Sequence, residues 1–281
     1  MRPELQKKID FAIKVMRWAQ QNADENFDGV VEICYSGGKD SDVILQLAKE
    51  AGINYRAIYK NTTIDPPGTI KHAEEKGAEI LRPKESFLKL IVRKGMPTRR
   101  ARFCCEALKE YKVLDVAVQG IRRCESTARA ERYKEPQICR VYNAKSKVKI
   151  YLPILEWTDQ DVEEFIKDRG IKCAPTYYDE QGNFHVERRL GCIGCPMQSD
   201  NGLADFKKYP KFAAAAAAAC EHYMIMNPQS SCRRKFRDGY ELFVHNIFFD
   251  SYQSFKEAVD GLFGTIDCKK FLEDYFNIKL K

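Results

Sequence analysis

The sequence has no apolar run that approaches the eighteen or so residues of a membrane span. Its first residues lead into an amphipathic pattern and contain no apolar signal-peptide core. It has no internal repeat, which excludes a repeat architecture. These absences predict a cytoplasmic protein that makes no membrane contact.

The sequence also lacks a strong charge of one sign. It contains 47 Lys and Arg and 40 Asp and Glu, and this modest basic excess suits a polyanionic partner such as a nucleotide without requiring nucleic acid. The 281 residues suffice for a substantial core without covalent staples. The eleven cysteines are unevenly spaced, so metal ligands, reactive thiols or core residues are expected more than a disulfide framework.

One glycine-containing segment organises the N-terminal half. Ser36-Gly37-Gly38-Lys39-Asp40-Ser41 follows an apolar run over 30–35 and opens a helical pattern that continues to residue 48. Adjacent glycines let the backbone approach an anion, while Ser36, Ser41 and the first helical N–H groups donate to phosphate oxygens. The spacing differs from a P-loop and from a dinucleotide fingerprint. A plain strand-to-helix turn is the alternative, and the six-residue pattern in this context favours a phosphate site.

Short apolar strands alternate with helical patterns through the first part of the chain. Helices are predicted over 4–22, 69–76, 86–92 and 158–166, strands over 30–35, 55–59, 79–82 and 113–118, a loop over 24–29, and a further apolar segment over 149–154. This alternation implies right-handed crossovers and an α/β fold, with a parallel twisted sheet flanked by helices. Ligands bind at the carboxyl ends of the strands in such sheets.

Beyond about residue 200 the strand signals end, and helical patterns rich in Phe and Tyr continue to the last residue. We therefore expect an N-terminal helix over 1–28, an α/β domain over 29–200 and a helical region over 201–281. Seven consecutive alanines over 213–219 favour a helix and indicate no function.

Four cysteines have a spacing that suits a metal centre. Cys104 and Cys105 are adjacent, while Cys192 and Cys195 form a CxxC turn that Gly194 relieves sterically. Four thiolates satisfy either tetrahedral zinc or a [4Fe–4S] cluster, and adjacent cysteines are uncommon at zinc sites. The remaining cysteines are isolated, and most are expected to pack as small apolar residues: Cys34, Cys124, Cys139, Cys173, Cys220, Cys232 and Cys268.

The loop and the paired cysteines resemble the phosphoadenosine phosphosulfate (PAPS) reductase family, of the PP-loop, adenine nucleotide alpha-hydrolase-like fold. The resemblance covers residues 28–200 and includes an element at 153–158. It implies that residues 36–41 bind the pyrophosphate of ATP and that Cys104, Cys105, Cys192 and Cys195 hold one [4Fe–4S] cluster. It also implies nucleotide-binding roles for Asp65, Gly120, Arg122, Arg123 and Arg129. Arginine donors suit phosphate or sulfate oxygens.

Two departures from the PAPS reductases matter. The loop is intact rather than degenerate, and the tail that carries their nucleophilic cysteine is missing; Cys268 lacks that motif. These features are closer to reductase-like ATP pyrophosphatases with an iron–sulfur site. Such an enzyme would adenylate a substrate with ATP and Mg²⁺ and then transfer sulfur, with Lys39, Asp40 and Arg122 as catalytic residues and Asp40 or Asp65 near the metal.

This hypothesis leaves the partners open: a nucleic-acid acceptor, a sulfur donor such as a cysteine desulfurase, and a homo-oligomer are all compatible with it. The basic stretches 93–102 and 233–237 motivate the nucleic-acid acceptor. Two alternatives are a thiol-dependent reductase of phosphoadenylyl or adenylyl sulfate, and a non-catalytic nucleotide- or nucleic-acid-binding module with structural zinc (Zn²⁺).

Overall fold

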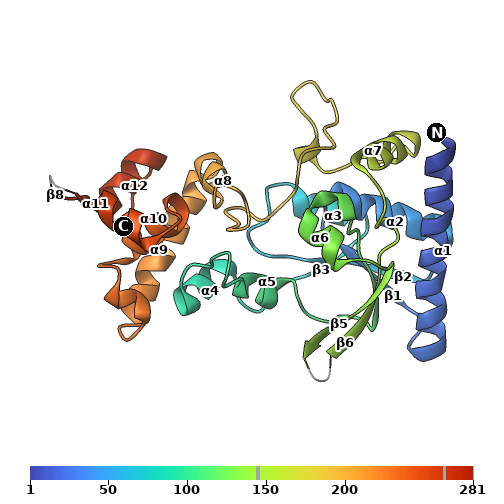
Figure 1. Ribbon diagram of the computed structural model, residues 1–281, viewed down its shortest axis with the longest axis horizontal. Helices are drawn as coiled ribbons and strands as arrows, with labels where there is room; N and C mark the ends of the chain where they lie inside the picture. Colours follow the sequence, from blue (N-terminus) through green and yellow to red (C-terminus); the bar gives the residue numbers. More distant parts are fainter. Residues whose placement is uncertain (144–145, 262–263, 281) are drawn as a thin grey trace. The chain divides into compact units, whose positions relative to one another are not determined.

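The computed structural model describes residues 1–143, 146–261 and 264–280 (Figure 1). The chain forms two compact units, each assembled from separate segments. Unit 1 comprises Met1–Asn61, Asp65–Arg82 and Glu110–Leu190, and unit 2 comprises Thr62–Ile64, Pro83–Lys109 and Gly191–Lys281. The continuous division at residues 28 and 200 stays a prediction about independently folding parts.

Unit 1 is built on a six-stranded sheet in the order β3-β2-β1-β4-β6-β5. The parallel strands are β1 (Val31–Tyr35), β2 (Tyr55–Lys60), β3 (Glu79–Leu81), β4 (Val116–Val118) and β6 (Ser146–Tyr151). The edge strand β5 (Gln137–Asn143) runs antiparallel to β6. The predicted α/β fold with a parallel sheet is confirmed, and the antiparallel strand is an addition that the sequence analysis missed.

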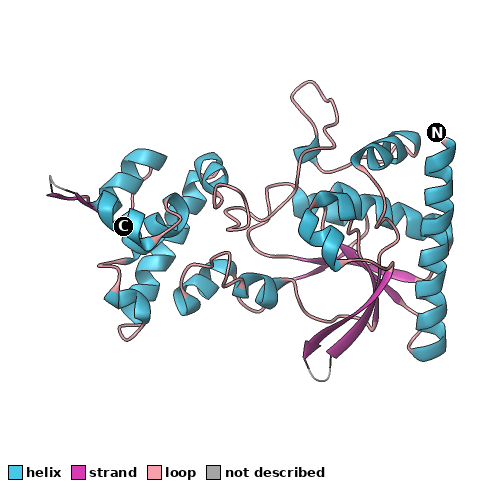
Figure 2. Ribbon diagram, viewed as in Figure 1, coloured by secondary structure: helices cyan, strands magenta, loops and turns pink. Residues whose placement is uncertain are grey.

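Helices flank this sheet, as the cyan and magenta elements of Figure 2 show. They are α1 (Pro3–Asn26), α2 (Lys39–Ala51), α3 (Thr69–Glu75), α6 (Thr127–Arg132) and α7 (Asp159–Asp168), with single 3-10 turns η1 (Arg123–Glu125) and η2 (Pro175–Tyr177). The apolar face of α1 is buried and contacts α2 and β4, because its apolar residues recur every three to four positions. The loop predicted to begin at Asp24 begins later, since α1 continues to Asn26.

Unit 2 is helical and has its own hydrophobic core. Its helices are α4 (Phe87–Lys94), α5 (Phe103–Leu108), α8 (Leu203–Lys208), α9 (Pro210–Met226), α10 (Gly239–Phe248), α11 (Tyr252–Val259) and α12 (Cys268–Phe276), with the 3-10 turn η3 (Ser231–Arg234). The alanine run lies within α9, which contacts α4 and α10. A Cβ on Gly239 would lie 2.1 Å from the backbone N of Glu221, so glycine is needed for α10 to approach α9 this closely.

The expectation that no strand follows residue 200 is wrong in one detail. A two-stranded antiparallel ladder joins β7 (Asp260–Gly261) to β8 (Gly264–Thr265). Strands of two residues are too short to carry an alternating apolar pattern, so the sequence gives no signal for them.

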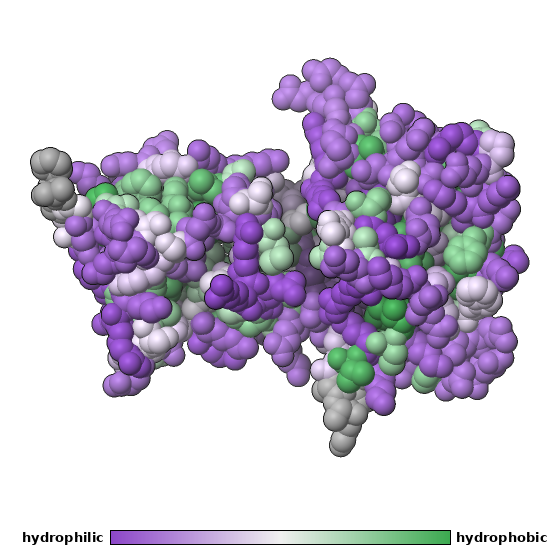
Figure 3. Space-filling model, viewed as in Figure 1, coloured by the Kyte–Doolittle hydropathy of each residue, from purple (hydrophilic) through white to green (hydrophobic). Residues whose placement is uncertain are grey.

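Polar residues cover most of the face of each unit that Figure 3 shows. None of the helices built from the described residues combines the length and apolarity needed to cross a membrane.

Candidate functional site

The loop between β1 and α2 places a helix N-terminus beside the carboxyl end of a buried strand. Gly37 has a φ of +77°, and a Cβ there would lie 2.7 Å from Thr69 Cγ2, so this turn requires glycine. Gly38 is the N-cap of α2, and its carbonyl accepts hydrogen bonds from the backbone N (2.9 Å) and the Oγ (2.6 Å) of Ser41. The predicted strand, glycine turn and helix are therefore present, and the loop has the backbone arrangement of an anion site.

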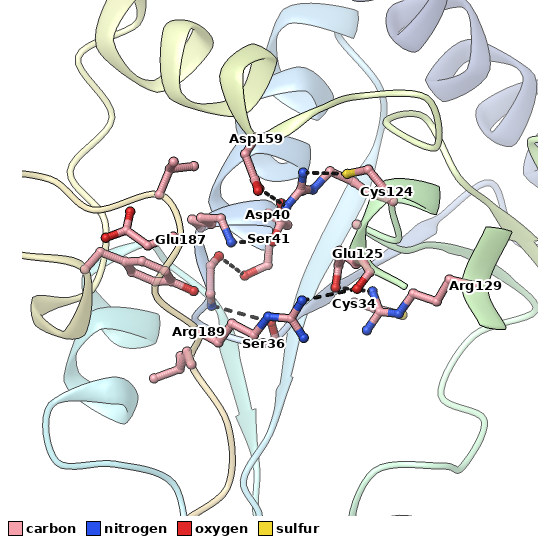
Figure 4. Close-up of a pocket in the computed structure, with 17 residues that line it drawn as sticks. Cys34, Ser36, Asp40, Ser41, Cys124, Glu125, Arg129, Asp159, Glu187 and Arg189 are labelled. Carbon is pink, nitrogen blue, oxygen red and sulfur yellow. Dashed lines mark hydrogen bonds and ion pairs between the residues drawn. The ribbon is translucent and has the colours of Figure 1, made fainter. Parts of the chain in front are cut away.

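A cavity of about 380 Å³ opens at this loop, and we call it the loop cavity (Figure 4). Its volume lies within the ~300–1,000 Å³ usual for small-molecule sites. It is lined by Cys34, Ser36, Gly38, Lys39, Asp40, Ser41, Gly120, Arg122, Cys124, Glu125, Arg129, Asp159, Tyr177, Val186, Glu187, Arg189 and Leu190. Every one of these residues belongs to unit 1.

Arg122 is the most buried cation of the loop cavity, with 1% of the residue exposed. Its Nε lies 2.7 Å from Asp40 Oδ1 in an ion pair that is not aligned as a hydrogen bond, and its Nη2 donates to Asp159 Oδ1 at 2.8 Å. Its Nη1 lies 3.2 Å from Cys124 Sγ. Burial lowers the pKa of Arg122, but the Asp40 charge and the Asp159 hydrogen bond outweigh it and raise the pKa above its usual value. The guanidinium therefore stays charged.

Gly120 lets the end of β4 approach the loop. A Cβ on Gly120 would lie 2.9 Å from the backbone O of Asp40, a distance that any other residue would have to relieve by moving backbone. This close approach brings the residues after β4 to the same cavity as the loop.

Lys39 is a second cation held out of water. It is 5% exposed, and its Nζ lies 3.4 Å from Asp40 Oδ2 and 5.5 Å from the centre of the Tyr177 ring. Burial raises the pKa of Tyr177, so the phenol stays neutral and can donate a hydrogen bond. A buried ammonium beside a phenol and a helix N-terminus suits the oxygens of a polyphosphate.

The opposite side of the loop cavity carries two more arginines (Figure 4). Arg129 Nη1 lies 2.5 Å from Glu125 Oε2, and Arg189 Nη2 donates to the carbonyl O of Glu125 at 3.2 Å. Ser126 accepts a hydrogen bond from the backbone N of Arg129 and thereby caps α6. The arginines come from α6 and from the segment after η2, so only the folded chain brings them together.

Most of the predicted nucleotide-binding residues line the loop cavity, and three do not. Gly37 belongs to the loop but is not a lining residue, and a Cβ there would meet Thr69. Arg123 Nη1 pairs with Glu156 Oε1 at 2.7 Å on a largely exposed surface. Asp65, in the loop after β2, does not line the cavity. The roles predicted for these three residues, as for the lining residues, stay predictions.

Several lining residues were not singled out from the sequence. Asp159 follows the N-cap of α7, Tyr177 lies in η2, and Glu187 and Arg189 lie in the segment after it. These positions are 119 or more residues from Asp40 in the chain, and no local spacing links them to the loop. Cys34 and Cys124, expected to be isolated thiols, also line the cavity.

The four predicted metal ligands share a second, smaller cavity in unit 2, which we call the cysteine cavity. Its volume is about 30 Å³, and it is lined by Thr62, Ile64, Phe87, Cys104, Cys105, Leu108, Lys109, Cys192, Gly194, Cys195 and Pro196. The hydrogen bond to Cys105 and burial raise the pKa of Cys104, and burial raises the pKa of Cys195.

The cysteine cavity is not a preassembled ligand set. Within residues 1–143, 146–261 and 264–280, no three His, Cys, Asp or Glu side chains are placed to hold a metal ion together. The chemistry of the lining nevertheless fits a thiolate-bound metal centre, because four cysteines face it and no histidine or carboxylate competes with them.

The CxxC turn is held from both sides. Asp205 Oδ2 accepts hydrogen bonds from the Gly194 backbone N (3.1 Å) and from Gln198 Nε2 (2.7 Å). The Arg99 guanidinium donates to the carbonyl oxygens of Pro196 (3.0 Å), Gln198 (2.7 Å) and Ser199 (3.2 Å), and to Asn201 Oδ1 (3.3 Å). Arg99 therefore ties the segment that leads to Cys104 to the loop that carries Cys195.

A mostly parallel sheet, with a glycine loop and a helix N-terminus at the end of its central strand, defines an α/β protein. A family model described as the phosphoadenosine phosphosulfate reductase domain matches residues 31–198. The chain belongs to this family.

The chain is also similar to individual curated proteins. The chain is 35% identical over 158 residues to an uncharacterised 37.8 kDa protein of Escherichia phage 186, covering 50% of this chain and 45% of that one. It is 24% identical over 199 residues to the adenosine 5′-phosphosulfate reductase of Streptomyces coelicolor, covering 66% and 77%. The matches span less than half the length of the first three curated relatives.

Among solved structures, the U34-tRNA thiolase NcsA from Methanococcus maripaludis with its [4Fe-4S] cluster covers 80% of this chain and 82% of its own, at 17% identity and a TM-score of 0.39.

Proposed function

We propose that this chain is a PAPS reductase-like ATP pyrophosphatase that activates a substrate by adenylation for sulfur transfer. The observation that carries the proposal is the loop cavity, where an intact anion loop meets two buried cations, Lys39 and Arg122. A degenerate loop would serve an already activated nucleotide, whereas an intact one suits the two terminal phosphates of ATP.

The proposed reaction has two displacements. A substrate oxygen attacks the α-phosphorus of ATP, an O–P bond forms, and the bond to the bridging oxygen of pyrophosphate breaks. A sulfur nucleophile then attacks the activated centre, so that a bond to sulfur replaces the bond to oxygen and AMP leaves with the electron pair. Both leaving groups are phosphate anions, which positive groups stabilise.

The residues of the loop cavity divide these tasks. Lys39 and the N–H groups of the loop would bind the departing pyrophosphate, and Arg122 would stabilise charge at the α-phosphate. Asp40, the carboxylate that the loop itself supplies to the cavity, would hold the Mg²⁺ that accompanies ATP. Its present contacts with Arg122 and Lys39 fix it beside both cations.

The cysteine cavity supplies the second part of the proposal. Cys104, Cys105, Cys192 and Cys195 would hold a [4Fe–4S] cluster through their four thiolates. A structural zinc bound by the same thiolates is the alternative. Anaerobic purification followed by iron, sulfide and zinc analysis distinguishes the two, because only the cluster contains labile sulfide.

Pyrophosphate release tests the ATP half. The protein is incubated with ATP, Mg²⁺ and candidate acceptors, and the wild type should release pyrophosphate. Lys39→Met, which keeps much of the buried volume, should reduce release by two to three orders of magnitude, about the loss seen when one transition-state donor is removed. Lys49→Ala, at the exposed end of the same helix, is the matched control. Equal release by wild type and Lys39→Met would refute the assignment of the loop.

A reductase of phosphoadenylyl sulfate or adenylyl sulfate is the second candidate, because the family model and a Streptomyces relative carry that activity in their names. It predicts sulfite from either nucleotide with reduced thioredoxin. Sulfite formation without pyrophosphate release from ATP would favour the reductase over the pyrophosphatase.

A further inference from the structure

The net charge of this protein resides entirely in one of its two units. Unit 1 contains 27 Lys and Arg against 27 Asp and Glu, whereas unit 2 contains 20 against 13. The whole excess of seven positive charges therefore belongs to unit 2, which holds the cysteine cavity and not the loop cavity.

Within unit 2 the excess is concentrated further. The segment Pro83–Lys109, which we call the basic segment, has eight Lys and Arg against two Asp and Glu, and Gly191–Lys281 has twelve against eleven. All eight basic side chains belong to exposed residues: Lys84, Lys89, Arg93, Lys94, Arg99, Arg100, Arg102 and Lys109. The basic segment is thus a short stretch of concentrated positive surface.

Acidic neighbours neutralise little of this charge. Arg93 pairs with Glu85 at 2.7 Å, and Lys94 lies 5.3 Å from the centre of the Phe103 ring. Arg100 and Arg102 are exposed, and neither has an ion-pair partner among the described residues. Two guanidinium groups are therefore available to an external anion.

The other basic stretch of the sequence behaves differently. Arg237 pairs with Glu241, and Arg233 donates to the carbonyl O of Arg237. Because the charges of Gly191–Lys281 nearly balance, the stretch over 233–237 is the weaker candidate for a polyanion. The structure thus separates two stretches that look alike in sequence.

The basic segment is also fixed beside the cysteine cavity. Arg99 donates hydrogen bonds to the loop that follows Cys195, and Cys104 and Cys105 belong to the basic segment itself. Lys109, its last residue, lines the cavity itself. Positive charge and thiols therefore belong to one local structure within unit 2.

We propose that the basic segment binds the phosphate backbone of a nucleic acid and presents it to the cysteine cavity as the sulfur acceptor. This inference rests on the proposed function, because it names the acceptor of that reaction. A nucleic acid fits better than a second mononucleotide because eight exposed basic residues spread along residues 83–109 match phosphates repeated along a chain rather than one compact group.

Salt dependence measures such contacts. Each phosphate contact contributes about −0.7 to the slope of log affinity against log salt for a single strand, so loss of two contacts reduces the slope by about 1.4. Over a fourfold rise in salt, the wild type should therefore lose about sevenfold more affinity than Arg100→Ala/Arg102→Ala. The probe is a fluorescein-labelled RNA hairpin with a long single-stranded loop, with DNA of the same sequence in parallel.

The matched control removes the same charge from the same unit. Arg233→Ala/Arg234→Ala should keep the wild-type slope, because the charges of Gly191–Lys281, the segment to which both residues belong, nearly balance. Equal losses in the two double variants, or binding that does not change with salt, would overturn the inference. Unchanged circular dichroism in both double variants checks that unit 2 stays folded.

The pyrophosphate assay separates this inference from the proposed function. Lys39→Met should bind the hairpin as the wild type does, since Lys39 belongs to unit 1. Pyrophosphate release without hairpin binding would overturn the nucleic-acid acceptor and leave the ATP pyrophosphatase intact. Hairpin binding by a protein that releases no pyrophosphate with any acceptor would refute the proposed function, and with it the role of the nucleic acid as acceptor.

Discussion

Gly194, the third residue of the CxxC turn, occupies a position where an added methyl group has no room. Its φ is +67°, and a Cβ there would lie 2.3, 2.7 and 2.9 Å from three ring carbons of Phe206. Phe206 is fully buried, with its ring centre 6.0 Å from that of Phe212 and 5.3 Å from that of Phe243. The ring cannot move without disturbing the core of unit 2.

The expected cost of Gly194→Ala has two parts. An L-residue in the left-handed region costs about 1–2 kcal/mol, and forcing an extra carbon into a packed core costs about 1–3 kcal/mol. The free energy of unfolding of unit 2 should therefore fall by about 2–5 kcal/mol. Gly191→Ala is the matched control, because a Cβ there meets nothing within 4 Å and its φ is not positive. Its effect should lie between zero and a gain of about 1 kcal/mol.

Urea unfolding followed by two probes measures this difference. Trp18 and Trp157, the only tryptophans, both lie in unit 1, so their fluorescence follows unit 1. Far-UV circular dichroism also includes the helices of unit 2, and this transition should move to lower urea in Gly194→Ala. Adding Phe206→Leu removes the ring contact but not the left-handed backbone, so the two changes should couple by about 1–3 kcal/mol. If Gly194→Ala and Gly191→Ala unfold at the same urea concentration, the steric reasoning is wrong.

Two further predictions concern unit 1. His185 Nε2 lies 3.0 Å from Asp179 Oδ2 and Nδ1 lies 2.9 Å from Glu187 Oε1, and these bonds raise the pKa of His185 above 6.5. The contribution of these bonds to the free energy of unfolding is therefore present below the pKa of His185 in the unfolded chain and is lost as pH rises through the raised folded-state pKa. An NMR titration of His185 should give a midpoint above 6.5, and Asp179→Asn should lower that midpoint. A wild-type midpoint at or below 6.5 would contradict this prediction. Thr158→Ala removes the capping box of α7 and should lower the free energy of unfolding by about 1 kcal/mol, measured by urea titration of tryptophan fluorescence. An unchanged midpoint would argue against the cap.

The sequence predicted the fold best where local chemistry decides the structure. The strand, glycine turn and helix around Ser36–Ser41 follow from an apolar run, a position that requires glycine and a helical period, all within twenty residues. The strand predicted over 113–118 begins only at Val116, because the Leu114 N donates to the side chain of Glu32 in β1 (3.2 Å) instead of to a backbone carbonyl of that strand. β5 was missed because Arg140 interrupts its apolar residues, so this edge strand lacks the continuous apolar run of a buried strand.

The same distinction applies to the loop cavity. Lys39 and Arg122 could be predicted as residues of one site because each lies within a recognisable motif next to a strand end. Asp159 and Tyr177 could not, since each reaches the cavity only after α7 and η2 have packed in unit 1. The sequence predicted Arg122 as a site residue but not its two ion pairs, because the motif does not reveal that Asp40 and Asp159 both reach Arg122 in the same cavity.

The charges of the loop cavity explain why a divalent cation belongs in the proposed reaction. Its lining contains four cationic and four anionic side chains, respectively Lys39, Arg122, Arg129 and Arg189, and Asp40, Glu125, Asp159 and Glu187. Since this lining is balanced and unit 1 as a whole is neutral, ATP alone would bring uncompensated negative charge into a partly enclosed site. A cation that accompanies the triphosphate relieves this excess, and a carboxylate beside the loop gives it a ligand. The basic segment of unit 2 has the opposite property, an excess of six basic over acidic residues, which is why the polyanionic acceptor is assigned to this segment and the nucleotide to the loop cavity.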